Sequence, residues 1–328
     1  MLHGHSAATA AFLAAHASGR MHHAWLLTGP QGVGKGSFAR AAALRLLADA
    51  AGPRVDLPGI ETPPDHRIVK LWEAGSHPDI MLLERLYRDK TKDFARSITV
   101  DQVRGLSRLF ATSPSFSPVR IVIVDAADDM ERSGANALLK LLEEPPADAI
   151  FLLVSHAPAR LLPTIRSRCR VLRFDPLGRE DMTSVLRGAL PDADVGELDA
   201  LAGIGDGAPG KAIRYAGLDV AGLDRAIESI VRSGDPDNGE RAALARSLAL
   251  KTAQPRYEAF LERLPTRIAA EAKRRDGQPL ADAVQAWEKA RALAGSAVRL
   301  SLDPQTTVFE LAGLLASLHQ TTGSPARR

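Results

Sequence analysis

The 328-residue sequence has almost no cysteine, no long apolar run and almost no surplus of charge. Its single cysteine, Cys169, excludes an internal disulfide and any zinc site built from several cysteines, and such usage suits the cytosol. No apolar run reaches the roughly 18 residues that a membrane-spanning helix needs, so we expect a cytoplasmic protein with no membrane partner. The net charge of +3 permits contact with nucleic acid without indicating it.

One segment matches a phosphate-binding loop in all positions but one. Residues 29–36 read Gly-Pro-Gln-Gly-Val-Gly-Lys-Gly, in which the glycines let backbone amides turn toward a phosphate and Lys35 reaches its oxygens. Gly36 stands where a serine or threonine would bind Mg²⁺. Ser37 is no substitute, because the next position on a helix is turned by about 100°. An apolar strand over 24–28 and a helix over 37–48 flank the loop and favour a true P-loop fold.

A second motif lacks one residue as well. In P-loop ATPases with an additional strand, an aspartate ending an apolar strand helps to hold Mg²⁺, and a glutamate directly after it activates water. Asp125 takes the first place and Ala126 the second, so we expect no efficient hydrolysis; the other interpretation is that Asp125 only ends a strand. Asp128 and Asp129 lie beyond the strand and are expected to point elsewhere. The candidate nucleotide-binding residues are Gly29, Gly32, Gly34, Lys35, Gly36 and Asp125.

Strands alternate with helices over the first half of the chain. This order predicts a parallel α/β sheet with helices on both faces. The predicted strands are 24–28, 79–83, 120–125, 149–155 and 170–174, and the predicted helices are 6–17, 37–48, 99–111 and one beginning near 133. Residues 49–77, with mixed charge, prolines and glycines, are predicted to form a loop or an insertion.

Only helical periods remain after the α/β part. Short helices separated by glycine and proline over 178–215 indicate a small helical lid. The later helical segments are 241–250, 256–274 (interrupted at Pro265), 280–300 and 308–318. We therefore predict a P-loop domain over 1–176, a lid over 177–217 and an all-α C-terminal domain over 218–328.

Several longer motifs in this order point to one family. They are Asn136-Ala-Leu-Leu-Lys-Leu-Leu-Glu-Glu-Pro-Pro146, Ser167-Arg168-Cys169, residues 18–24, His77-Pro-Asp79 and Ile98–Arg104. On these residues the chain resembles the clamp loader subunits of bacterial DNA polymerase III, which belong to the AAA+ proteins. The resemblance covers about residues 15–176 and continues through 207–211, whereas the C-terminal part is similar only in length and helical character.

This resemblance implies a function within an assembly. Clamp loader subunits form a five-membered ring that opens the sliding clamp and places it on primer–template DNA. The implied partners are gamma/tau motor subunits and a delta subunit, with the clamp and the DNA reached through the complex. The chain looks most like the stator, whose Ser-Arg-Cys arginine reaches ATP on a neighbouring motor subunit; Arg168 takes that place. Otherwise Arg168 is one of several basic residues that flank a strand.

The chain departs from this family in two places. The cysteines of its usual zinc module are absent, so we expect no zinc, and residues 49–77 must hold together without metal or be disordered. Gly210, followed by Lys211, stands where motor subunits carry a sensor arginine. Ser155 takes a polar sensor position or merely ends its strand. The retained Lys35 leaves binding of ATP or ADP without hydrolysis open.

Three functions remain in competition. The first is a non-hydrolysing stator that offers Arg168 to a neighbour, and the second is an ATP-hydrolysing motor subunit of the same clamp loader. The third, a P-loop small-molecule kinase, needs an acceptor site and has no use for a helical C-terminal domain. The basic residues of 90–96 are interpreted as a solvated face, with DNA contact as the alternative.

Overall fold

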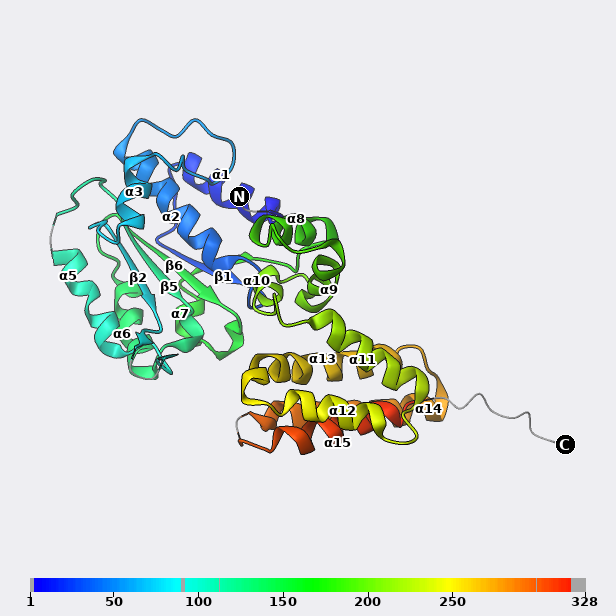
Figure 1. Cartoon of the computed structure of the whole chain (residues 1–328). Helices are drawn as coiled ribbons and strands as arrows, with labels where there is room; N and C mark the ends of the chain where they lie inside the picture. Colours follow the sequence, from blue (N-terminus) through cyan, green and yellow to red (C-terminus); the bar gives the residue numbers. More distant parts are fainter. Residues whose placement is uncertain (1–2, 90–91, 112, 299, 320–328) are drawn as a thin grey trace. The chain divides into compact units, whose positions relative to one another are not determined.

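The computed structural model describes residues 3–89, 92–111, 113–298 and 300–319 (Figure 1). The chain divides into two compact units. One comprises residues 1–185 with 206–211, and the other comprises 186–205 with 212–328. The three-part division stays a prediction. Among the described residues, no helix is long and apolar enough to cross a membrane.

The first unit is built on a five-stranded parallel sheet with the order β2-β5-β6-β1-β7. Its strands are β1 (Ala24–Thr28), β2 (Ile80–Glu84), β5 (Arg120–Asp125), β6 (Ala149–Ser155) and β7 (Arg170–Arg173). The strands read as nearly continuous apolar runs because both faces of the sheet are covered. All five predicted strands are confirmed, each end within one residue.

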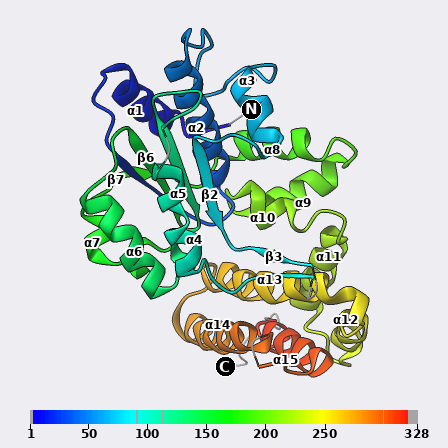
Figure 2. The same ribbon diagram turned by 90° about the vertical axis from the view of Figure 1, so that its left-hand side faces the viewer.

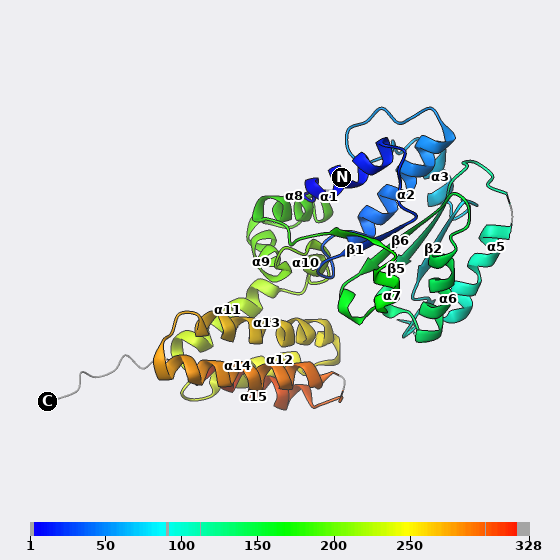
Figure 3. The ribbon, with the colours of Figure 1, turned by 180° about the vertical axis from the view of Figure 1, so that it is seen from behind.

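Helices cover both faces of this sheet (Figures 1 and 3). One face carries α1 (Ser6–Ala17), α2 (Lys35–Ala51) and α3 (Arg67–Glu73), whose side chains Phe12, Phe38 and Ile68 lie in one buried cluster. The other face carries α4 (Val100–Arg104), α5 (Leu106–Ala111), α6 (Arg132–Glu143) and α7 (Pro163–Arg166), packed in a second cluster. The predicted α/β class is confirmed.

Three local features differ from the prediction. The segment 49–77, predicted as a loop or an insertion, contains the helix α3. This helix begins after His66, whose ring accepts a hydrogen bond from Ile68 N. The helix predicted over 99–111 begins with the expected capping box of Thr99 and Gln102, but it is divided at Gly105 into α4 and α5. A short hairpin of β3 (Tyr87–Arg88) and β4 (Asp93–Phe94) was not predicted, and its four strand residues are exposed.

Among the described residues of the second unit, all regular secondary structure is helical, as predicted. Its complete helices are α9 (Val195–Gly205), α11 (Val220–Ser233), α12 (Gly239–Leu248), α13 (Gln254–Ala272), α14 (Gly277–Ala297) and α15 (Pro304–Ala316). Two boundaries between the units fall within α8 (Arg179–Ala189) and α10 (Pro209–Ile213), and a third follows the end of α9. The predicted interruption at Pro265 is wrong, because α13 continues through it. A proline inside a helix costs about 3 kcal/mol; here the packing of α13 against α14 and α15 offsets that cost.

Candidate functional site

The phosphate-loop motif forms the turn between β1 and α2. Gly29, Gly32 and Gly34 have φ values of 150°, 82° and 113°, a region that favours glycine. A Cβ atom on Gly29 would also lie 2.1 Å from the carbonyl oxygen of Phe174. Glycine is therefore required here both by the turn and by the close approach of a neighbouring segment.

Lys35 begins α2 and is 2% exposed. Its Nζ donates to the carbonyl oxygens of Gly29, at 2.7 Å, and Pro30, at 2.5 Å. Burial lowers the pKa of Lys35 to about 8, although Asp125 and Asp128 oppose the shift. Two of the three donors of the ammonium are therefore directed to the loop itself, and a phosphate has to compete for them.

The guanidinium of Arg40 lies beside Gly36 and Asp125, the two positions where Mg²⁺ ligands were sought. A Cβ atom on Gly36 would lie 2.4 Å from Asp125 Oδ2, so the carboxylate takes the room that a side chain at position 36 needs. Arg40, one turn along α2, places Nη2 3.6 Å from the same oxygen and 3.8 Å from Glu84 Oε2. Asp125 thus faces Arg40, and a Mg²⁺ ion has no hydroxyl ligand at position 36.

The turn after β5 is tied to the end of β6. Asp128 accepts hydrogen bonds from Ser155 Oγ at 2.9 Å, His156 N at 2.5 Å and Ala157 N at 3.3 Å. Ser155 is fully buried, and its hydroxyl proton is used on Asp128. Ala126, next to Asp125, offers no group that could accept a proton from water. Asp128 and Ser155 therefore have a structural partner in each other, and β6 is the additional strand between β1 and β5.

The lid position closes directly on the phosphate loop within the first unit. Gly210 N donates to Gly32 O at 2.8 Å. A Cβ atom on Gly210 would lie 3.1 Å from Gly32 Cα and from Gly32 O. Glycine at 210 thus permits backbone-to-backbone contact at the place where motor subunits are expected to carry an arginine.

Arg168 and Lys35 lie at opposite ends of the parallel strands. Arg168 precedes β7, which runs parallel to β1, so it lies at the amino ends of the strands, whereas the phosphate loop follows a carboxyl end. The four residues of β7 alone span about 10 Å. The half-buried Arg168 donates to Thr164 O at 3.0 Å and pairs with Glu143 Oε1 at 2.8 Å. The structure gathers the predicted nucleotide-site residues around one loop and leaves Arg168 apart from them.

Burial also decides the state of Cys169, beside Arg168. It raises the pKa of the thiol to about 12, so the sulfur stays protonated near neutral pH. The side chain packs against the second core cluster. Cys169 therefore serves as a small packing residue next to Arg168.

Sequence reasoning missed Arg45, which organises part of the segment 49–77, for which no zinc was expected. From α2 its guanidinium donates to the carbonyl oxygens of Val55, Leu57, Gly59 and Glu61, at 2.9 to 3.4 Å. Its Nε pairs with Asp49 at 3.0 Å, and Asp49 accepts from Val55 N at 2.8 Å. No group of three or more potential ligands among the described residues is arranged to hold a metal. The expectation of no zinc stays a prediction.

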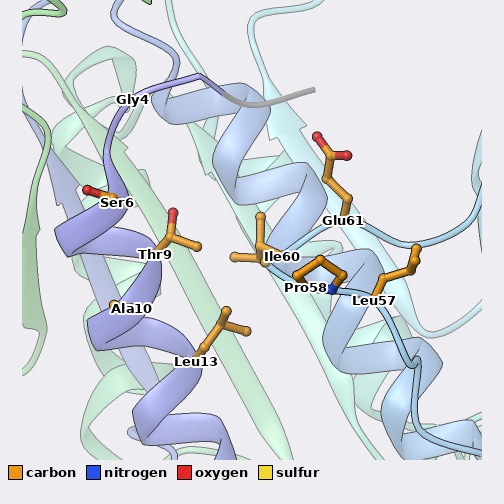
Figure 4. Close-up of a pocket in the computed structure, with 10 residues that line it drawn as sticks. Gly4, Ser6, Thr9, Ala10, Leu13, Leu57, Pro58, Ile60 and Glu61 are labelled. Carbon is orange, nitrogen blue, oxygen red and sulfur yellow. The ribbon is translucent and has the colours of Figure 1, made fainter.

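The loop held by Arg45 forms one wall of a groove of about 570 Å³. Figure 4 shows Leu57, Pro58 and Ile60 on the loop across from Thr9 and Leu13 of α1. Among the described residues that line it, Glu61 alone has an ionisable side chain. This described lining is mostly apolar and offers no pair of groups suited to acid–base chemistry.

Comparisons with known proteins place the chain. A sequence model of the family described as "DNA polymerase III, delta subunit" matches residues 4–178, more than half of the chain. The chain belongs to this family. The resemblance found from the motifs is thereby confirmed at the level of the family.

Individual relatives carry related names. The chain is 38% identical over 202 residues to "DNA polymerase III subunit delta'" of Pseudomonas aeruginosa, covering 60% of this chain and 57% of that protein. It is 35% identical over 183 residues to "DNA polymerase III subunit gamma/tau" of Mycobacterium tuberculosis, covering 56% and 29%. A gamma subunit-related protein of Thermotoga maritima aligns over 90% of this chain and 94% of its own, with 16% identity and a TM-score of 0.42. The chain spans little more than half of the length of the first relative.

Proposed function

We propose that this family member is the stator-type, delta-prime subunit of a bacterial clamp loader, which does not hydrolyse ATP itself. Three features of its own site support this: the Arg40–Asp125 ion pair beside Gly36, Ala126 in place of a general base, and the lid glycine on the phosphate loop. The partners we propose are gamma/tau motor subunits and a delta subunit in a hetero-pentamer, acting in the cytoplasm on the sliding clamp and primer–template DNA.

The position of Arg168 carries the proposal. It lies at the sheet edge opposite its own phosphate loop, so it is suited to a nucleotide held by another subunit. Its half-buried guanidinium is held by Thr164 O and Glu143. These two contacts orient the guanidinium and do not use all five of its N–H donors. A guanidinium offered in trans offsets the charge that develops on a γ-phosphate. If Arg168 exchanged its contact with Glu143 for one with the phosphate oxygens of a neighbouring subunit, assembly would be coupled to ATP turnover by that subunit.

The experiment uses the reconstituted complex with Arg168→Ala. We expect the complex to assemble, and ATP turnover at the neighbouring site to fall by about 10³-fold or more, the usual effect of losing such an arginine. Arg168→Lys keeps the charge but loses the planar fork, so it should be defective as well. Arg166→Ala removes an exposed basic residue two positions away and is the matched control. Clamp loading and turnover by Arg168→Ala complexes at the wild-type rate would refute the proposal.

The alternative is an ATP-hydrolysing motor subunit. Lys35 and the similarity to a gamma/tau subunit favour it. Turnover by the purified chain that Lys35→Ala abolishes would establish this alternative. We propose instead that any ATP or ADP binds at Lys35 without hydrolysis. Equilibrium binding of each nucleotide with and without Mg²⁺ should then give equal affinities, because Arg40 already neutralises Asp125.

A further inference from the structure

The β3–β4 hairpin exposes two aromatic side chains to solvent. Tyr87 is 53% and Phe94 52% exposed, and Phe309 is the only other exposed aromatic residue among the described parts of the chain. The two residues are direct partners across the hairpin, so their side chains share one face. Their ring centroids are 5.3 Å apart with an interplanar angle of 70°, an edge-to-face contact that leaves ring surface open.

The base of the hairpin is fastened to the sheet. Figure 2 shows the hairpin extending beyond the end of β2. On the entering side, Gln102 donates to Glu84 O at 2.9 Å, and Arg85 pairs with Asp129 at 3.1 Å. On the leaving side, Ile98 N donates to Asp129 O at 2.8 Å and Ser97 Oγ to Glu131 at 3.0 Å. These anchors hold the aromatic pair at a fixed place on the sheet edge instead of on a free loop.

Basic residues surround the aromatic pair. Among the described residues of 85–96 there are four basic and two acidic side chains, a net charge of +2, whereas the whole chain carries only +3. Exposed Lys92 and Arg96 lie two positions before and after Phe94, and exposed Arg88 follows Tyr87. The described residues around the aromatic pair thus carry a local positive surplus.

We propose that this hairpin binds single-stranded DNA, with unpaired bases stacking on Tyr87 and Phe94 and phosphates lying against Arg88, Lys92 and Arg96. Aromatic rings beside cations are the usual platform for unpaired nucleotides, since every base offers a flat face and every linkage a negative charge. A duplex keeps its bases stacked and offers these rings nothing. The proposal goes beyond the stator function and does not involve Arg168.

The test measures binding of the full-length chain to a fluorescently labelled oligothymidylate by anisotropy at low salt. Stacking contributes about 1–3 kcal/mol per base, so Tyr87→Ala and Phe94→Ala should each raise Kd between about 5-fold and 150-fold. Tyr87→Phe keeps the ring and should bind nearly as the wild type does. Removing Lys92 and Arg96 together should lower the slope of log Kd against log salt by about 1.4.

Phe309→Ala is the matched control, because Phe309 is also exposed and has the guanidinium of Arg241 4.9 Å from its ring. It should leave Kd unchanged, and so should Arg168→Ala. Urea unfolding of each variant checks that the fold is intact. The proposal is overturned if the wild type shows no saturable binding, if the aromatic variants bind as tightly as the wild type, or if duplex DNA binds equally well. It is also overturned if Tyr87→Ala and Phe94→Ala weaken binding to partner subunits and leave binding to the oligothymidylate unchanged.

Discussion

Replacing Arg45 by alanine removes the centre of the segment that connects α2 to α3. Arg45 is 11% exposed and Asp49 3% exposed in their side chains, so the ion pair is almost fully buried. The substitution leaves Asp49 with His16 and Val55 N, and it leaves four carbonyl oxygens without their charged donor. Breaking a buried ion pair from one side costs about 3–5 kcal/mol, because the remaining charge stays desolvated.

We therefore expect Arg45→Ala to lower the free energy of unfolding by about 3–5 kcal/mol, a large share of the 5–15 kcal/mol typical of folded proteins. Arg45→Lys keeps the charge opposite Asp49 but not the fork that reaches the carbonyls, so its loss should be smaller. Urea unfolding followed by tryptophan fluorescence measures the free energy of unfolding of both variants. Limited proteolysis tests whether the segment loosens, since cleavage of Arg45→Ala should move into residues 52–66.

The control for Arg45 is Arg104→Ala, which removes a 71% exposed arginine paired with its helix neighbour Asp101. Its effect should stay within about 0.5 kcal/mol, as is usual for surface pairs. An Arg45→Ala chain that unfolds at the wild-type urea concentration, with the wild-type cleavage pattern, would show that the segment is held by its apolar contacts alone.

Two further predictions concern the candidate nucleotide site. Burial lowers the pKa of Lys35 to about 8 from an ordinary 10.5, so between these pH values the unfolded chain binds more protons than the folded chain. The free energy of unfolding should therefore rise with pH over this range. A Lys35→Met variant whose free energy of unfolding rises equally would contradict this assignment. Gly36→Thr puts a Cβ atom 2.4 Å from Asp125 Oδ2 and 3.2 Å from Arg40. It should lose about 1–3 kcal/mol in urea unfolding without gaining Mg²⁺-dependent nucleotide binding, and such a gain would refute the packing argument.

The sequence predicted the sheet well because its signals are local. The apolar runs around Val122 and Leu152 are buried on both faces, and the glycines at 29–34 meet a backbone demand that sequence spacing already encodes. The position of Arg168 before its strand also follows from motif order. Arg168 and Lys35 could thus be placed on opposite edges once the strands were known to be parallel.

The features that were missed depend on contacts between distant residues. Nothing in the spacing of Arg45 indicates that carbonyl groups 10 to 16 residues later converge on it. Arg40 looks like any helix residue until Asp125 is folded against it. The hairpin was missed because its strands are only two residues long, too short for a visible alternation.

The Arg40–Asp125 pair also limits what the phosphate-loop site can respond to. The guanidinium of Arg40 is covalently attached to α2, so its effective concentration beside Asp125 is fixed. The concentration of a diffusible ion such as Mg²⁺, in contrast, changes with conditions in the cell. Chelators and swings in free magnesium leave the charge balance of the pair unchanged. In the ring that we propose, such a site is a fixed reference beside members that respond to their ligands.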